Sequence, residues 1–260
     1  MSAWFVDQPT AVVVLALGAL FVLIALVTLF VARQRATPAT HSVAGPLMPA
    51  LGAAFGVLVA ITIANEAVNY RAAQDGVVAE AATGAKLAWA STTVGLDMAA
   101  IQGALTDYVD ATAVDGWAAL GRGQSGSPIA RDRLADLQRL VRTQAAVPGL
   151  GSAQASELLT SVGDLSRLRR TRIDVAGRDL DSLYLFVILF SGAALVVNAV
   201  LLTVGHRWIV ALVPAGLVLV VVVAVSLAVS LGSPFRGGLE VSRAPLTSLA
   251  NDLRTGYFSR

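Results

Sequence analysis

The sequence predicts an all-α integral membrane protein, with four transmembrane helices and a helical bundle inserted between the second and the third. The first observation is composition: 56% of residues are hydrophobic and 14% are charged, whereas a soluble domain carries about 25% charged residues. The second is four apolar runs, each close to the ~20 residues that cross a bilayer. The third is the interval 71–181, which holds 12 basic and 13 acidic side chains, repeats apolar residues at helical spacing and lacks sustained strand-like alternation.

The first apolar run, residues 11–32, predicts a membrane helix over about 9–32 that the protein retains. No Lys or Arg precedes the run, whereas a cleaved signal peptide needs a basic start and a shorter apolar segment. Arg33 and Arg35 follow it, and we expect them to end the helix. The segment 33–46 is polar and contains Pro and Gly, so a loop is expected there.

The second membrane helix is expected to begin near Pro46 and to leave the membrane while still helical. Its uncharged core over 47–64 turns polar at Asn65, Glu66 and Asn69 without a helix breaker. A carboxylate at this depth is costly unless it faces water, a partner or a cavity. These three polar residues therefore suggest a pore mouth or an ion-binding ring. The alternative is that Glu66 is an interfacial residue that faces water.

Three residues are candidates for helix packing within the membrane. Gly52 and Gly56 form a GxxxG pair, whose spacing places both on one face where another helix can approach closely. The sequence leaves open whether that helix belongs to the same subunit. Asn198, deep in the third apolar run, is expected to form an interhelical hydrogen bond worth about 1 kcal/mol.

Residues 71–181 predict four amphipathic helices packed as an antiparallel bundle. The first continues from the membrane, and the second covers about 95–119. The third begins at Ser127 and Pro128, which make a good N-cap and first helical residue. The preceding break, 121–128, has GxGxxG spacing but joins two helices, so no dinucleotide site is expected there.

The fourth helix of the bundle carries an arginine cluster just before the third membrane helix. On a helix, Arg169 and Arg172 share one face, and Arg167 and Arg170 share another. The cluster suits contact with anionic lipid or the concentration of anions near a pore. The alternative is salt bridging to aspartates within the bundle.

The third and fourth membrane helices, about 182–204 and 208–231, must form an antiparallel hairpin because the turn between them is very short. A tail that we expect to be polar closes the chain. The chain thus divides into 1–70 (membrane helices one and two), 71–181 (soluble bundle), 182–231 (membrane hairpin) and 232–260 (polar tail).

The charges beside the membrane helices favour one orientation in the cell membrane. Arg33 and Arg35 follow an N-terminus without basic residues, so the positive-inside rule places the first loop in the cytoplasm and the bundle outside it. The arginine cluster, Arg236 and Arg243 argue for the opposite orientation. We give the cluster less weight because long segments translocate largely regardless of charge.

The sequence contains no constellation typical of an enzyme or of a cofactor or metal site. It has no Cys, only two His, and no HExxH, GxSxG, P-loop or EF-hand pattern. We therefore expect no catalytic residues, metal ligands or cofactors. A net charge of +2 is too small to suggest nucleic-acid binding. The expected partners are the lipid bilayer, further copies of the chain, and another membrane or envelope protein.

Short motifs along residues 50–250 resemble, in their order and spacing, the DUF4239 family of bestrophin-like membrane proteins. The motifs are Phe55-Gly56, Glu80-Ala81, Tyr108-Val109, Trp117, Arg169 with Arg172, and Pro234-Phe235 with Gly237 and Gly238. Gly116 departs from the pattern, because the family often has an acidic residue before the Trp.

The resemblance implies a distant likeness to bestrophins, which are oligomeric anion channels with four membrane helices per subunit. By that likeness the second helix would line a central pore. Two features differ from bestrophins. Phe55 is the only aromatic residue of the second helix before Tyr70, so an aromatic pore neck is not evident. Bestrophins also keep the corresponding domain in the cytoplasm, against the orientation inferred from charge.

Two functions fit these observations. The first is an oligomeric ion channel or pore lined by the second helix, in which a Glu66 ring would favour cations and the arginine cluster anions. The second is a non-conducting membrane adaptor or accessory subunit whose bundle binds a partner protein. A water-filled axis beside the second helix would distinguish the first from the second.

Overall fold

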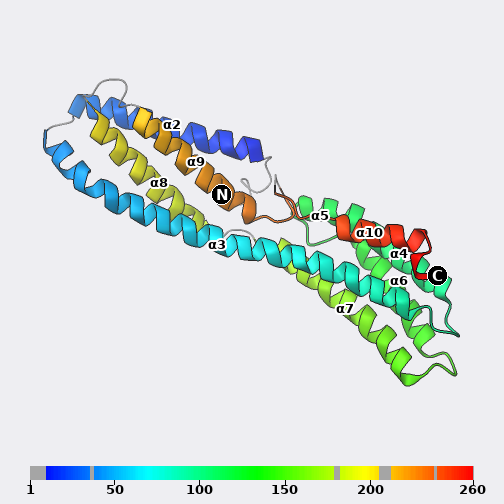
Figure 1. Cartoon of the computed structure of the whole chain (residues 1–260). Coiled ribbons are helices and arrows are strands. Elements are labelled where there is room, and N and C mark those ends of the chain that lie inside the picture. Colours follow the sequence, from blue (N-terminus) through cyan, green and yellow to red (C-terminus); the bar gives the residue numbers. More distant parts are fainter. Residues whose placement is uncertain (1–9, 36–37, 179–181, 205–211, 237–238, 260) are drawn as a thin grey trace. The chain divides into compact units, whose positions relative to one another are not determined.

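The computed structural model describes residues 10–35, 38–178, 182–204, 212–236 and 239–259, and among these it is all-helical with no strand (Figure 1). This confirms the predicted all-α class. Four helices are long and apolar enough to span a membrane: α2 (Thr10–Arg35), α3 (Pro38–Ala90), α8 (Ser182–Thr203) and α9 (Leu212–Leu231). The chain divides into two compact units, and α3 contributes residues to both.

The first unit comprises residues 1–69, 179–233 and 237–239. Its helices α2, α8 and α9 contact one another pairwise, and Phe55 of α3 is buried in the same apolar core. Gly192 of α8 permits close packing, because a Cβ there would lie 2.9 Å from Val221 and 3.3 Å from Phe55. The absence of a side chain at this position therefore lets α3 and α9 pack closely against α8.

The expected loop over residues 33–46 was wrong. Helix α2 continues to Arg35, and α3 already begins at Pro38, where the fixed φ of proline suits the first turn of a helix. Pro46 and Pro49 lie inside α3 and cannot donate backbone hydrogen bonds to the preceding turn. The loop was expected because the segment is polar and contains prolines. The structure shows that α3 accommodates Pro46 and Pro49 near its start.

The second unit comprises residues 70–178, 234–236 and 240–260. It contains the C-terminal part of α3 and a set of shorter helices. These are α4 (Met98–Ala111), the π-helix η1 (Thr112–Gly116), α5 (Trp117–Gly121), α6 (Pro128–Ala145), α7 (Ser152–Ala176), α10 (Ala244–Arg254) and the 3₁₀ turn η3 (Tyr257–Ser259).

The start of α6 confirms the cap predicted from Ser127 and Pro128. The Ser127 side chain accepts a hydrogen bond from the Ala130 backbone N–H at 3.4 Å, and Pro128 opens the helix. Helix α4 begins in the same way, because the Asp97 carboxylate accepts from the Ala100 N–H at 2.9 Å. Each cap satisfies one N–H that would otherwise lack a partner at the helix start.

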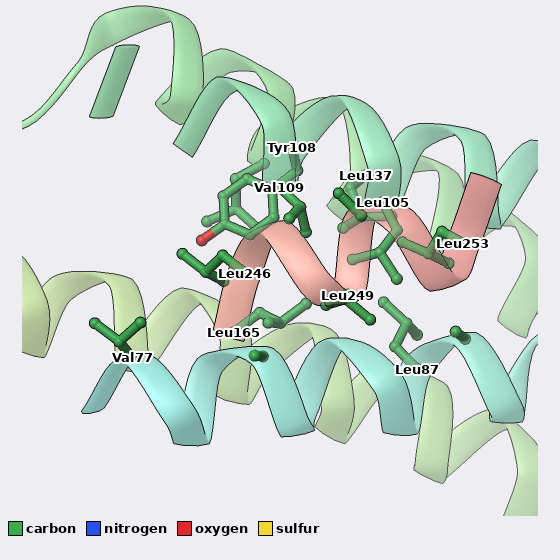
Figure 2. Packing of buried hydrophobic residues seen from close by; sticks show 14 of the residues in the cluster. Val77, Leu87, Leu105, Tyr108, Val109, Leu137, Leu165, Leu246, Leu249 and Leu253 are labelled. Carbon is green, nitrogen blue, oxygen red and sulfur yellow. The ribbon is translucent and has the colours of Figure 1, made fainter. Parts of the chain in front are cut away.

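The core of the second unit is built from the apolar stripes that periodicity indicated. Leu105 and Tyr108 of α4, Leu137 of α6 and Leu165 of α7 are buried together (Figure 2). The edges of two stripes do not join this core, since Ile129 remains 52% exposed and Leu159 43% exposed. Helical spacing thus predicted correctly which residues lie at the centre of each apolar face. Whether the residues at the edge of a face are buried depends on the neighbouring helices.

The segment expected to be a polar tail contains a helix that packs into the second unit. Leu246, Leu249 and Leu253 of α10 are buried in its core (Figure 2). Leu249 lies against α3 at Gly84, where an added Cβ would be 2.5 Å from the leucine Cδ2. The i, i+3, i+7 spacing of these leucines is typical of an amphipathic helix, but the stretch is short and surrounded by polar residues.

Candidate functional site

Four helices bring charged and aromatic side chains together inside the second unit. Glu80 comes from α3, Tyr108 from α4, Trp117 from α5 and Arg172 from α7. None of the four is more than 4% exposed. We call these four residues the buried charge cluster.

An ion pair forms the centre of this cluster. Arg172 Nη1 lies 3.1 Å from Glu80 Oε2, and the Tyr108 hydroxyl donates to the other carboxylate oxygen, Oε1. The Arg172 guanidinium carbon lies 5.4 Å from the centre of the Trp117 ring. A cation over an aromatic face contributes about 2 kcal/mol when it is desolvated. Glu80 and Trp117 thus both compensate the buried charge of Arg172.

The contact between Arg172 and Glu80 is an ion pair rather than a well-directed hydrogen bond. Among the described residues, Arg172 Nε, Arg172 Nη1 and Glu80 Oε2 have no hydrogen-bond partner of acceptable geometry. The free-energy cost of removing a charge from water is offset only when an opposite charge or hydrogen-bond partner lies close to it. Removing either residue would therefore leave the other as an uncompensated charge.

Trp117 links the cluster to the segment that follows α9. Its indole Nε1 donates to the Val241 carbonyl oxygen at 3.3 Å. Its ring meets Phe235 edge to face, with centroids 5.5 Å apart and an interplanar angle of 77°. Phe235 is 2% exposed and Val241 1%. The motif residues Trp117 and Phe235, distant in sequence, therefore share one contact.

The π-helix η1 precedes Trp117 directly and was not predicted, since we expected one uninterrupted helix over 95–119. A π-turn widens the helix and disturbs the regular pairing of its carbonyls. Arg243 Nη1 donates to one of them, that of Ala113, at 3.2 Å. Gly116 is not required by space, because a Cβ there would meet its nearest neighbour, the Ala111 oxygen, at an ordinary 3.6 Å.

Burial changes the protonation behaviour of two groups at the cluster. It raises the pKa of the Tyr108 phenol above its usual value of 10.0, and the negative charge of Glu80 raises it further. Tyr108 therefore stays protonated and acts as a donor. Burial also lowers the pKa of the half-buried Arg169 guanidinium, which nevertheless stays charged because arginine is not deprotonated in proteins.

The arginines of α7 separate onto two faces, as the helical spacing indicated. Arg172 points into the cluster, and Arg169 Nη2 donates to the Ser127 carbonyl at 3.4 Å. On the exposed face, Arg167 pairs with Asp164 at 3.2 Å, and Arg170 Nη2 contacts a serine hydroxyl at 3.5 Å. The four therefore do not form one positive patch, and the partner of Arg172 is Glu80 rather than a nearby aspartate.

The polar residues at the exit of α3 lie on different sides of that helix. Asn65 is exposed, whereas Glu66 and Asn69 are partly buried. Asn69 Nδ2 donates to Glu66 Oε2 at 3.4 Å. Successive residues turn by about 100°, so Glu66 follows the stripe of α3 that contains buried Val59 and Thr62. The expected ring of three polar residues thus has only Asn65 on the exposed side.

The exposed side of α3 in the membrane segment is made mainly of small residues, and we call it the open face. It consists of Ala50, Ala53, Ala54, Gly56, Val57, Ala60, Ile61, Ala64, Asn65 and Val68. A Cβ added at Gly52 or Gly56 would meet no described atom within 4 Å. The GxxxG pair therefore has no packing partner among the described residues of its own chain.

Asn198 joins α8 to the first turns of α3. The residue is 5% exposed, and its Nδ2 donates to the Ala44 carbonyl oxygen at 3.0 Å. It also lies 3.5 Å from the Met48 sulfur. This part of α3 lacks the N–H groups of Pro46 and Pro49. Asn198 thus joins α8 to this proline-containing part of α3 by one interhelical hydrogen bond.

Comparison with known proteins relates most of the chain to a family. A family model described as the bestrophin-like domain matches residues 14–246. No curated protein and no solved structure matches the chain. The matched range includes the motif residues of the cluster together with Pro234 and Phe235, while the motif residues Gly237 and Gly238 lie outside the described residues.

Proposed function

Because the chain belongs to the bestrophin-like family of membrane proteins, we propose that it assembles into an oligomeric ion channel or pore whose path α3 lines. The observation that carries this proposal is the open face of α3. It lies within the span of α3 that is apolar enough to cross a membrane, and no described residue of the same chain covers Gly52 or Gly56.

The side chains on the other membrane helices differ from those on the open face. Leu15, Leu23 and Phe30 of α2 are 71%, 58% and 65% exposed, and Phe186 and Phe190 of α8 are 58% and 68% exposed. Large apolar side chains suit contact with lipid. Small residues instead let helices approach closely in a membrane. This contrast supports an arrangement in which α3 meets other copies of the chain around a path, while α2 and α8 face lipid.

Side chains of both charge signs lie near the exit of α3 from its membrane segment. Asn65 lies on the open face, and Arg71, six residues further along the helix, is exposed. Glu66 lies on the other side of the helix, bonded to Asn69. The proposal therefore places Asn65 in the path and assigns Glu66 and Arg71 an electrostatic influence at its mouth.

Helix α3 also supports a mechanical role. It continues without interruption for 53 residues and carries both the open face and Glu80. A rearrangement around the buried charge cluster would therefore act on the same helix that carries the open face.

Ion flux through liposomes that contain the purified full-length protein tests this proposal. Mass measurement first establishes that the reconstituted protein is a homo-oligomer. The proposal expects flux of at least one small ion, altered in the Glu66→Ala variant. A properly assembled oligomer that passes no ion would contradict the proposal.

A hollow beside η1 favours a second candidate, a non-conducting adaptor or accessory subunit that binds a partner protein. The hollow measures about 350 Å³ and is lined partly by Asp115, by Asp107, which pairs with Arg133 of the same lining at 3.4 Å, and by Asp110, which pairs with Arg254. Val114 and Ile129 in its lining are 63% and 52% exposed. These exposed apolar side chains with charged groups around them suit the apolar face of an amphipathic segment. Loss of a co-purifying partner on Val114→Asp, with no ion flux from the wild type, would support this candidate.

A further inference from the structure

We propose that a cavity between α2, α8 and α9 binds one acyl chain of a phospholipid, and that Arg33 holds the phosphate of its headgroup. The cavity measures about 270 Å³ and lies entirely within the first unit. Val22, Leu26 and Leu29 of α2 form one wall. The other sides are lined by Val200 and Thr203 of α8 and by Pro214, Ala215 and Val218 of α9.

Among the described residues that line the cavity, Thr203 has the only polar side chain, and the Thr203 hydroxyl donates to the Val200 carbonyl oxygen at 2.9 Å. A buried water typically makes about three hydrogen bonds, so apolar cavities stay dry. The described lining, which is almost entirely aliphatic, therefore suits an apolar occupant.

The position of the cavity indicates that this occupant comes from the bilayer. All three helices that line it are long and apolar enough to span a membrane. Val22 and Leu26 are 47% and 58% exposed, so the α2 wall is open on its outer side. A chain that moves from the bilayer into the cavity stays in apolar surroundings, so van der Waals packing rather than removal from water favours its binding. A flexible unbranched chain can follow aliphatic walls.

Arg33 supplies the second half of the site. It lies four residues after Leu29 on α2, hence on the same helix face and about 6 Å further along the axis. Its side chain is exposed and forms no ion pair with any described residue. A guanidinium binds phosphate with paired, charge-assisted hydrogen bonds. The apolar cavity and the adjacent cation match the two parts of a phospholipid.

Native mass spectrometry of the full-length protein, delipidated and then supplied with defined lipids, tests the proposal. Phosphatidylglycerol is compared with diacylglycerol, which has the same chains without phosphate, and with glycerol phosphate, which has the headgroup alone. The wild type should retain one phosphatidylglycerol per chain, bind diacylglycerol about tenfold more weakly and not retain glycerol phosphate. Equal retention of phosphatidylglycerol and diacylglycerol would contradict the role of Arg33.

Two variants and a control separate the halves of the site. Ala215→Phe fills the cavity and should abolish retention of both lipids, whereas Val220→Phe, at an exposed position of α9 outside the cavity, should not. Arg33→Gln should remove only the preference for phosphatidylglycerol over diacylglycerol. Unchanged lipid retention by Ala215→Phe would overturn the proposal. Crosslinking that places a second copy of the chain against Ala215 would overturn it as well.

Discussion

The carboxylate of Glu80 lies 3.1 Å from the guanidinium of Arg172, and both residues are almost fully buried. Glu80 belongs to the helix that continues from the membrane segment, and Arg172 belongs to α7. The pair therefore fastens the C-terminal part of α3 within the second unit. Its contribution to stability is open to direct measurement.

Removal of one partner should destabilise the second unit strongly. Arg172→Leu leaves the Glu80 carboxylate buried without its cation, and such changes cost about 3–5 kcal/mol. We expect a loss of this size in the free energy of unfolding of the full-length protein in detergent, measured by denaturant titration. Arg167→Leu is the matched control, because its exposed pair with Asp164 should contribute about 1 kcal/mol or less. A similar effect of the two variants would contradict the assignment.

Alkaline pH should reduce stability through Tyr108. Its pKa is raised in the folded protein by burial and by Glu80, so the unfolded chain loses the phenolic proton first, near pH 10. The contribution is fully present below pH 10 and is lost as the pH rises from there towards the folded pKa, by about 1.4 kcal/mol per pH unit. Tyr108→Phe removes this titrating group, so the slope of the unfolding free energy against pH should fall by the amount that corresponds to one proton. Denaturant titrations between pH 8 and 11 measure both slopes, and identical slopes would refute the prediction.

Two glycines of α3 should respond to alanine in opposite directions. Gly84→Ala places a methyl group against buried Leu249 and should lower the free energy of unfolding by about 1–3 kcal/mol. Gly76→Ala meets no described atom within 4 Å and should raise it by up to about 1 kcal/mol through helix propensity. Thermal unfolding of both variants checks the pair. Stabilisation by Gly84→Ala would show that α10 does not pack closely there.

Sequence periodicity predicted the helices of the second unit because their core faces repeat over several turns. Leu105, Leu137 and Leu165 all occupy the faces that the pattern indicated. The arginine faces followed from the same reasoning, because Arg169 and Arg172 are three residues apart. The family resemblance, based on short motifs in order, is confirmed by the match over residues 14–246.

Other features depend on contacts that sequence spacing does not encode. Glu80 and Arg172 meet only because α3 and α7 pack together, although a charged Glu80 within a stripe that includes Val77 and Ala81 is a usable signal. The π-helix at Thr112–Gly116 and the burial of α10 likewise depend on tertiary packing. The sequence also did not predict which side of α3 is exposed. Asn65 and Glu66 are adjacent in sequence, yet they lie on different sides of the helix.

Bulk added at Gly56 should affect assembly rather than folding. In a single chain a side chain there meets no described atom within 4 Å, so Gly56→Leu should leave the helical content unchanged. If α3 meets neighbouring copies, the variant should shift the oligomer towards smaller species, as measured by light scattering in detergent. Gly18→Leu on α2, equally free of near neighbours, is the control. Equal assembly of the two variants would contradict an interface at Gly56.

Charges near the exit of α3 should bias ion preference in opposite directions. Glu66→Gln removes a negative charge and should lower the permeability of cations relative to anions, whereas Arg71→Gln should raise it. Reversal potentials across a salt gradient measure the ratio. Shifts of the same sign in both variants would exclude a direct electrostatic influence.

Cysteine modification along α3 tests most directly whether this helix lines an ion path. The chain has no native cysteine, so Ile61→Cys on the open face and Ile63→Cys on the packed side can be compared without further changes. The account predicts that a charged thiol reagent reduces ion flux through Ile61→Cys and leaves flux through Ile63→Cys unchanged. Flux that is unaffected at Ile61→Cys, or reduced only at Ile63→Cys, would contradict it.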